Sequence, residues 1–257
     1  MSIKTATIDG VATIEIARPE KKNALTVAMY QAMAEALNAA REDAAVRAVL
    51  ITGQPGIFTS GNDVEDFLTR PPGQGSDSMD SPVFRFMRAL LDCDKPVVAA
   101  VTGAAIGIGT TLLLHCDFVY VSDEARLAMP FVALGLVPEY ASSLLVPQLM
   151  GHRRAAEKLL LGDPFTPEQA VECGIANAVL PAAEVVAHAR RVALRFNALP
   201  PGAVREAKQL MRAPERERLL QTIRTEGEVF GRRLRSPEAT EAFQAFLHKR
   251  KPDFSRF

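Results

Sequence analysis

The chain has 257 residues, 48% of them hydrophobic, which is enough to bury a sizeable core as one large domain, or as a core with a small appendage. Its 30 Lys and Arg balance its 30 Asp and Glu, which argues against a nucleic-acid-binding protein that relies on bulk charge. Three widely spaced cysteines and four scattered histidines predict neither a disulfide framework nor a metal site.

Strand and helix patterns alternate through the first hundred residues. The dipeptide Asp9-Gly10 between two alternating segments is a strong hairpin signal, and a strand on either side of a helix predicts parallel pairing. The expected elements are strands Ile3–Ile8 and Val11–Ala17, a helix capped by Thr26 and running to about Asp43, strand Val46–Thr52, a helix within Asp63–Leu68, a loop over Arg70–Ser81, helix Pro82–Asp92 and a strand starting at Val97.

From Glu139 onward the pattern is mostly helical. We therefore expect an α/β core over residues 1–199 and a helical C-terminal subdomain over residues 200–257. The expected helices are Glu139–Met150, Arg153–Leu161, Pro167–Cys173, Ala182–Asn197, Pro201–Met211, Pro214–Arg232 and Ser236–His248, with one strand within Ile175–Leu180.

No sequence signal indicates export or membrane insertion. Residues 1–17 alternate as a strand does, rather than forming a basic and then apolar leader. No apolar run reaches the length of about 18 residues that spans a bilayer, and the final Ser255-Arg256-Phe257 is not the usual peroxisomal tripeptide. We expect a cytoplasmic protein without a membrane or nucleic-acid partner.

The segment from Asp94 to Glu139 is the most informative. An apolar run, Val97–Val101, leads into a glycine-studded turn, Gly103–Gly109. A helix-length apolar segment, Thr110–His115, and a second apolar run, Phe118–Val121, follow. Backbone N–H groups at the start of such a helix can hold an anion or an oxyanion, so the turn is a candidate site.

A dinucleotide-binding turn is the competing interpretation of this segment. That fingerprint requires G-x-G-x-x-G at the start of a helix, but Gly107 and Gly109 are followed by Leu112 in place of the third glycine. No acidic residue ends an evident strand about 20 residues later, where a ribose contact would be needed. We therefore expect no nucleotide cofactor.

Several further motifs follow one another along nearly the whole chain. They are Ala17–Leu25 (ARPEKKNAL), Ile57–Asp63 (IFTSGND), Lys95–Gly103 (KPVVAAVTG), Gly107-Ile-Gly109, Cys116-Asp117 and Pro130–Gly135 (PFVALG). In this order they resemble the crotonase superfamily, also called the enoyl-CoA hydratase/isomerase family. The resemblance implies a ββα spiral core, helices that cover the active site or pack on a neighbouring subunit, and a homotrimer or a dimer of trimers.

The resemblance also implies an oxyanion hole made of two backbone N–H groups. By the matching motifs these belong to Asn62, after Gly61, and to Ile108, between two glycines. They would hold the thioester oxygen of an acyl-CoA as an enolate develops, and each such donor contributes about 3–4 kcal/mol to transition-state stability. Taken singly, Gly61 and Gly107 could equally mark tight turns.

The same matching places the substrate along the neighbouring loops, with coenzyme A as part of the substrate and no separate cofactor. Each lysine of these loops could equally be a solvated side chain, and Asp63 could equally cap the next helix. The residues implied in substrate and CoA binding are Lys22, Ala24, Leu25, Ser60, Gly61, Asp63, Gly107 and Phe131.

The acid–base residues distinguish the reactions of the family. Its hydratases use two glutamates, but the matching positions here are Thr111 and Phe131, and neither side chain transfers protons at neutral pH. Members that move a double bond from position 3 to position 2 carry one glutamate where this chain has Glu139. One base suffices for that reaction, because the group that removes the C2 proton can return it at C4.

We therefore expect an enoyl-CoA isomerase in which Glu139 is both base and acid. A hydratase or hydratase-type lyase of the same family is the second interpretation. A non-catalytic acyl-CoA-binding or assembly subunit is the alternative from another class. In that case Glu139, after Pro138, would merely complement the dipole of a helix in its first turn.

Overall fold

The computed structural model describes residues 2–65 and 80–257. The loop expected over residues 70–81 and the helix expected over residues 63–68 lie largely outside this part of the chain. The α/β class and the helical C-terminal region are both confirmed. The division at residue 200 stays a prediction, and the long helix α9 begins at Pro201.

The larger sheet has six strands in the order β1-β2-β3-β5-β7-β9. The first two form the antiparallel hairpin expected around Asp9-Gly10, and the others are parallel to their neighbours. The strands are β1 Ile3–Ile8, β2 Val11–Ile16, β3 Ala48–Thr52, β5 Val97–Val101, β7 Phe118–Ser122 and β9 Ala178–Leu180.

A second, three-stranded parallel sheet has the order β4-β6-β8, with β4 Ile57–Thr59, β6 Ala104–Ile106 and β8 Arg126–Ala128. Each of these strands follows a strand of the larger sheet, so the chain repeats a strand–strand–helix unit. The sequence analysis assigned Ala104–Ile106 to a turn, which was wrong. Three residues are too few for a periodic pattern to reveal a strand.

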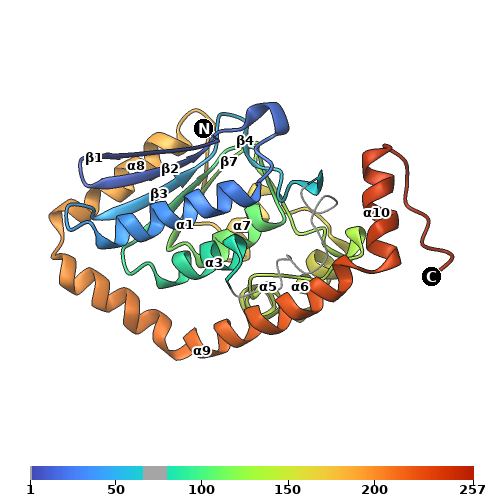
Figure 1. The fold of residues 1–257 in the computed structure, drawn as a ribbon. Helices are drawn as coiled ribbons and strands as arrows, with labels where there is room; N and C mark the ends of the chain where they lie inside the picture. The colour runs from blue at the N-terminus through green and yellow to red at the C-terminus, as the bar shows by residue number, and fades with distance from the viewer. Residues whose placement is uncertain (1, 66–79) are drawn as a thin grey trace.

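Helices cover both faces of the larger sheet (Figure 1). On one face lie α1 Val27–Glu42 and α3 Pro82–Asp92, which begin where Thr26 and Ser81 accept backbone N–H groups. On the other lies α8 Val185–Leu194. Strand side chains point alternately to the two faces, so the inner strands β2, β3, β5 and β7 contribute to two separate hydrophobic cores.

The remaining helical segments connect these layers and form the C-terminal region. They are η1 Pro19–Lys21, α4 Ile108–Thr111, η2 Leu112–His115, η3 Val132–Leu134, α5 Ser142–Met150, α6 His152–Ala156, η4 Glu157–Leu161, α7 Pro167–Glu172, η5 Arg195–Ala198, α9 Pro201–Leu234 and α10 Pro237–Leu247.

Several helix boundaries differ from the prediction, and two of the differences have a clear physical cause. Helix α5 begins at Ser142 rather than Glu139, because Tyr140 and Ala141 have left-handed φ angles of 58° and 58° that interrupt a right-handed helix. Helix α9 runs through Pro214 instead of ending before it. A proline removes one backbone hydrogen bond and bends a helix without always ending it, and α9 is visibly bent in Figure 1.

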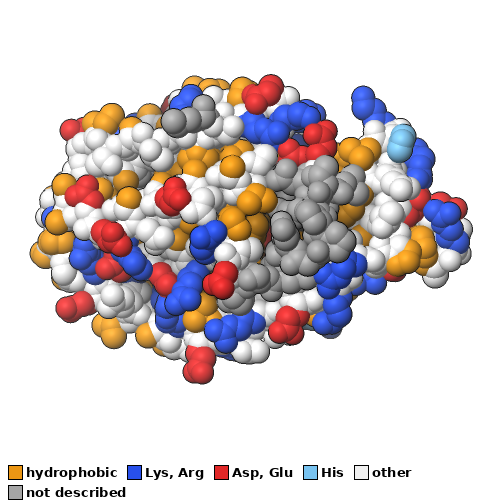
Figure 2. Space-filling view, in the orientation of Figure 1, with side chains coloured by type: hydrophobic (Ala, Val, Ile, Leu, Met, Phe, Trp, Pro, Cys, Tyr) orange, Lys and Arg blue, Asp and Glu red, His pale blue; other side chains and the backbone are white. Residues whose placement is uncertain are grey.

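Charged side chains of both signs are spread over the face shown in Figure 2. Helix α10 and the C-terminal tail lie at one edge of the molecule (Figure 1), where Ala239 and Phe243 of α10 join the main hydrophobic core. This outlying part exposes large hydrophobic side chains, among them Phe246, Leu247, Phe254 and Phe257. Among the helices that the structure describes, none is long and apolar enough to cross a membrane.

Candidate active site

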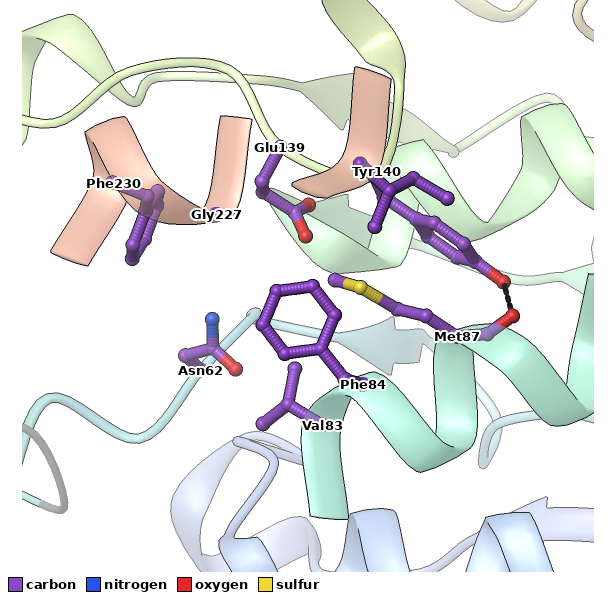
Figure 3. Close-up of a pocket in the computed structure, with 9 residues that line it drawn as sticks. Asn62, Val83, Phe84, Met87, Glu139, Tyr140, Gly227 and Phe230 are labelled. Atoms are coloured by element: carbon purple, nitrogen blue, oxygen red, sulfur yellow. Dashed lines mark hydrogen bonds between the residues drawn. The ribbon is translucent and has the colours of Figure 1, made fainter. Parts of the chain in front are cut away.

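A pocket with about 450 Å³ of empty space opens between α3, α9 and the segments that follow β4 and η3. In Figure 3 the Glu139 carboxylate points into it toward the Phe84 ring, and Asn62 lies on the opposite side. The lining is mostly apolar: Val83, Phe84, Met87, Tyr140, Ile223, Gly227 and Phe230 accompany Asn62 and Glu139. An apolar chain with one polar end fits such a surface.

Glu139 is the carboxylate that faces this pocket. Only 7% of the residue is exposed, and its Oε1 accepts a hydrogen bond of 2.5 Å from Thr111 Oγ1. The pKa of Glu139 is raised to about 8. Burial is the largest cause, the Thr111 hydrogen bond opposes it, and the nearby charge of Glu226 adds to it. A carboxylate with such a pKa is a stronger base than a solvated one, and its protonated form is available near neutral pH.

The structure corrects the expectation that Glu139 could sit in the first turn of a helix. Glu139 precedes α5 by three residues, and its carboxylate meets Thr111 instead of the helix N-terminus. The backbone carbonyl of Glu139 accepts from Ser142 Oγ at 2.7 Å. The side chain is therefore free of the capping role and is directed into the pocket.

Thr111 occupies a position at which family hydratases would carry one of their glutamates, and here it is a hydrogen-bond donor to Glu139. It is fully buried, and its hydroxyl donates to the Glu139 carboxylate. A hydroxyl donor stabilises the ionised carboxylate, so this residue works with Glu139 rather than as a second acid or base.

The segment after β4 presents the N–H of Asn62. Leu25 forms a parallel bridge with Asn62, in which Leu25 N–H donates to the Gly61 carbonyl at 2.8 Å and Asp63 N–H donates to the Leu25 carbonyl at 3.0 Å. In a parallel bridge the residue between those two partners turns its own N–H to the other side. Within the described residues the Asn62 N–H has no acceptor, which suits an oxyanion donor.

The glycine-rich turn presents the second N–H. Gly107 has φ 57° and ψ −118°, a conformation that side chains strongly disfavour. Ile108 is the first residue of α4, so its N–H has no acceptor inside the helix, and no other described group accepts it. A Cβ added to Gly61, which has φ 92°, would lie 2.9 Å from the Ile106 carbonyl oxygen, so the two donor loops adjoin.

The predicted CoA-binding residues lie together beside the first donor loop. Lys22 is exposed, and its carbonyl accepts from Ser60 N–H at 3.1 Å. Ala24 and Leu25 continue the same strip. Phe131 follows β8 and lies beside the second donor loop, with its ring 3.8 Å from the position of a Cβ on Gly107. The structure thus brings these residues into one neighbourhood, and their contact with a substrate stays a prediction.

Asp63 connects the backbone segments on both sides of the first donor loop. It forms a 2.6 Å ion pair with Arg18, which also donates to the Ala24 carbonyl. Its other oxygen accepts from Glu65 N–H at 3.0 Å. Asp63 therefore ties the donor loop to the Lys22–Leu25 strip and also holds the backbone that follows it.

Two organising residues were missed from sequence. Asn23 is fully buried, and its side-chain amide donates to the carbonyls of Ile16 and Phe58; an asparagine within a predicted turn was the available signal. Glu226, on α9, accepts from backbone N–H groups of Ala141 and Ser143. It follows them by more than 80 residues in sequence, so no local pattern indicated the contact.

The raised pKa of Glu139 predicts a pH-dependent stability difference. A carboxyl whose pKa rises from 4.5 to about 8 on folding destabilises the fold progressively as pH increases between those values. Glu139→Gln removes this cost, which has an upper limit of roughly 5 kcal/mol. We expect the variant to be more stable than wild type at pH 9 and similar at pH 5, measured by denaturant unfolding. An equal difference at both pH values would contradict the pKa assignment.

The chain is similar to known proteins along nearly its whole length. Residues 6–256 match the family model described as enoyl-CoA hydratase/isomerase. Human enoyl-CoA delta isomerase 2 is 36% identical over 245 residues, which are 94% of this chain and 62% of that protein. The chain thus spans less than two thirds of that relative. A probable enoyl-CoA hydratase of Bacillus subtilis is 28% identical, over 98% of each chain.

The fold is also found among solved structures. The structure of Pseudomonas aeruginosa OdaA matches with a TM-score of 0.93 and 56% identity, over 96% of this chain and 99% of that one. This likeness confirms the expected arrangement of strands and helices, while the relatives carry both isomerase and hydratase names.

Proposed function

Because the chain belongs to the enoyl-CoA hydratase/isomerase family, we propose that it moves a double bond of an enoyl-CoA from position 3 to position 2, with Glu139 as the single base and acid. One observation carries the proposal. In the described pocket, the carboxylate that faces the apolar space is that of Glu139. At the position where a family hydratase would carry a glutamate the chain has Thr111, whose hydroxyl donates to Glu139.

The reaction follows from this arrangement. The thioester oxygen accepts the N–H groups of Asn62 and Ile108, which makes the C2 protons more acidic. The Glu139 carboxylate removes a C2 proton, and the electron pair spreads over the thioester oxygen and the former double bond as a dienolate. The protonated Glu139 then delivers the proton to C4, which leaves the double bond between C2 and C3 and regenerates the carboxylate.

The environment of Glu139 supports both halves of this cycle. The pKa of Glu139 is about 8, which is closer to the pKa of the substrate C–H group than the pKa of a solvated carboxyl is. The proton can therefore move in either direction between them. The Thr111 hydrogen bond keeps the carboxylate oriented while the proton is away.

Hydration is the second candidate, supported by the hydratase names among the relatives. It requires one group to activate water at C3 and another to protonate C2. Thr111 and Phe131 occupy the positions at which the family resemblance expects those two groups, and the ring of Phe131 is apolar. A non-catalytic acyl-CoA-binding subunit would convert neither substrate.

We also propose that the chain forms a homotrimer or a dimer of trimers through the C-terminal region. Exposed Phe246 and Phe257, at 61% and 54%, are apolar surfaces of the kind that a neighbouring subunit covers. The CoA part of the substrate is proposed to lie along Lys22, Ala24 and Leu25, where the lysine can pair with phosphate. Cytoplasmic location stays a prediction from sequence.

The proposal is tested by offering 3-enoyl-CoA to the purified protein. We expect a product of unchanged mass with the absorbance of a conjugated 2-enoyl thioester. Because Glu139 must be ionised to remove the C2 proton, kcat/KM should rise with pH through about 8. If binding is measurable and no conversion occurs at any pH, the non-catalytic alternative is correct.

A further inference from the structure

A second buried carboxylate, from Glu226 of α9, lies directly behind the turn that carries Glu139. Only 7% of Glu226 is exposed. Its Oε2 accepts the Ala141 N–H at 2.5 Å, and its Oε1 accepts the Ser143 N–H at 2.9 Å and the Ser143 hydroxyl. Burial raises the pKa of Glu226, and the donors that both of its oxygens meet oppose this effect by stabilising the ionised carboxylate.

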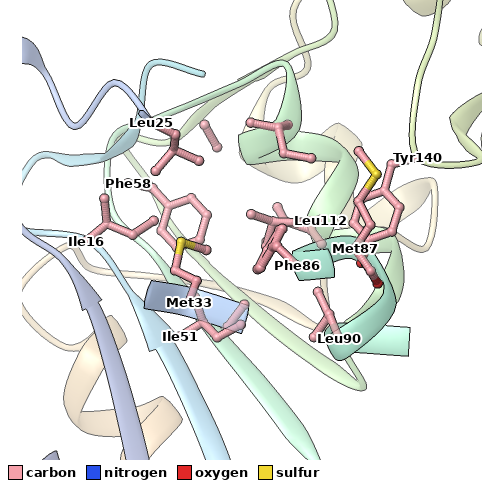
Figure 4. Packing of buried hydrophobic residues seen from close by; sticks show 14 of the residues in the cluster. Ile16, Leu25, Met33, Ile51, Phe58, Phe86, Met87, Leu90, Leu112 and Tyr140 are labelled. Carbon is pink, nitrogen blue, oxygen red and sulfur yellow. The ribbon is translucent and has the colours of Figure 1, made fainter. Parts of the chain in front are cut away.

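The turn that Glu226 holds is strained. Tyr140 and Ala141 both have φ of 58°, and a non-glycine residue in this region costs about 1–3 kcal/mol unless its surroundings hold it. Three contacts do so around Tyr140: His115 Nε2 donates to its carbonyl at 2.8 Å, its hydroxyl donates to the Met87 carbonyl at 2.8 Å, and its ring packs beside Phe86 and Met87 (Figure 4). Glu226 holds the other half of the turn, at Ala141.

Helix α9 links this contact to the pocket. Ile223, Gly227 and Phe230 line the cavity. Ile223 and Phe230 are three and four residues from Glu226 and therefore share its side of the helix, and Gly227 is next to it in sequence. A Cβ added to Gly227 would lie 2.4 Å from Phe84 Cζ, so α9 closely approaches the α3 wall. The helix that closes the cavity is thus the one that supplies Glu226.

We propose that Glu226 is a positioning residue, whose carboxylate holds the turn Tyr140–Ala141 and thereby fixes the Glu139 carboxylate in the pocket. The inference rests on the proposed function, since it acts through Glu139. Glu226 is not among the residues that line the cavity, and its effect is on geometry and on the charge next to the base.

The electrostatic surroundings of the turn make this role measurable. Burial lowers the pKa of His115 to about 3 and raises the pKa of Tyr140 well above its ordinary value, so both are neutral near pH 8. Arg212 on α9, Cys116 after η2 and Asp92 on α3 act on Tyr140 from further away. The negative charge that raises the pKa of Glu139 is that of Glu226.

The test compares Glu226→Gln with wild type. Glutamine has one acceptor oxygen and presents an NH₂ group to N–H donors, so the turn loosens and we expect kcat to fall about 10- to 100-fold with little change in KM. Removing the charge should also move the acid limb of kcat/KM to lower pH. Glu228→Gln, exposed on the same helix, is the matched control and should leave both unchanged.

A purely structural role would lower the melting temperature without moving the pH limb. Glu226→Gln that folds and keeps both the wild-type kcat and the wild-type pH limb overturns the proposal. If this variant does not fold, Ser143→Ala removes one of the three donors and carries the test. We expect kcat to fall about threefold, well below the roughly 100-fold that a 1 Å misplacement can cost, and an unchanged kcat overturns the proposal.

Glu139→Gln is measured alongside to separate the two claims. If Glu139→Gln is as active as wild type, the proposed function fails, whatever Glu226→Gln does. If Glu139→Gln is inactive and Glu226→Gln behaves as wild type, only the positioning role fails.

Discussion

Replacing Glu139 with glutamine is expected to reduce isomerisation of 3-enoyl-CoA by at least about 100- to 10,000-fold, the usual contribution of a positioned general base. Glutamine has nearly the same shape, and its carbonyl oxygen can still accept from Thr111. It cannot take up the C2 proton. The measurement is the initial rate of 2-enoyl-CoA formation, together with the affinity for a saturated acyl-CoA, which should be unchanged.

The solvent-facing Glu228→Gln variant should retain wild-type activity and controls for loss of one negative charge. An undiminished rate in folded Glu139→Gln would remove Glu139 from the mechanism. Loss of both rate and acyl-CoA binding would indicate a damaged pocket instead of a missing base.

Damage to either oxyanion donor should cost about 100- to 1,000-fold in kcat. Gly107→Val places a branched side chain on a residue with φ 57° and ψ −118°, which moves the Ile108 N–H. Asn62→Pro deletes the other donor outright, and this N–H has no acceptor among the described groups. The measurement is kcat per folded molecule, with folding checked by circular dichroism.

Each variant has a matched control. Gly151→Val places the same side chain at φ 79° and ψ 155°, where a Cβ would meet nothing within 4 Å, remote from the pocket. It should cost stability and leave turnover intact. Asn62→Ala keeps the backbone N–H and should retain most activity. Normal turnover by folded Gly107→Val or Asn62→Pro would place the oxyanion hole elsewhere.

Local signals in the sequence were sufficient for much of the fold. The hairpin could be predicted because Asp9-Gly10 adopts the positive φ angles that a tight turn needs. The starts of α1 and α3 could be predicted because Thr26 and Ser81 satisfy N–H groups of their own first turns. In both cases the determinants lie within a few residues of the structure that they specify.

The turn after Glu139 could not be predicted, because its determinants are distant in sequence. Tyr140 and Ala141 carry no glycine or asparagine signal for a positive φ. Contacts from His115 and Glu226 hold them there. The predicted helix start at Glu139 was therefore wrong, although the choice of Glu139 as the candidate base does not depend on it.

The candidate site illustrates the same division. Motif matching selected Glu139, Asn62 and Ile108; the structure places Glu139 and Asn62 on one pocket and the turn before Ile108 beside the Asn62 loop. From the sequence alone, Thr111 was identified only as a position that lacks the glutamate of family hydratases. Its hydrogen bond to Glu139, 28 positions later in the chain, is visible only in the folded structure.

The most direct test of a one-carboxylate isomerase is to offer 2-enoyl-CoA alone and measure hydration. Loss of enoyl absorbance and formation of the 3-hydroxyacyl product by mass are compared with isomerisation of 3-enoyl-CoA under the same conditions. Because Thr111 and Phe131 provide no second acid or base, hydration is predicted to be weak or absent beside isomerisation. Hydration at a rate equal to or above that of isomerisation would contradict the account and identify the protein as a hydratase.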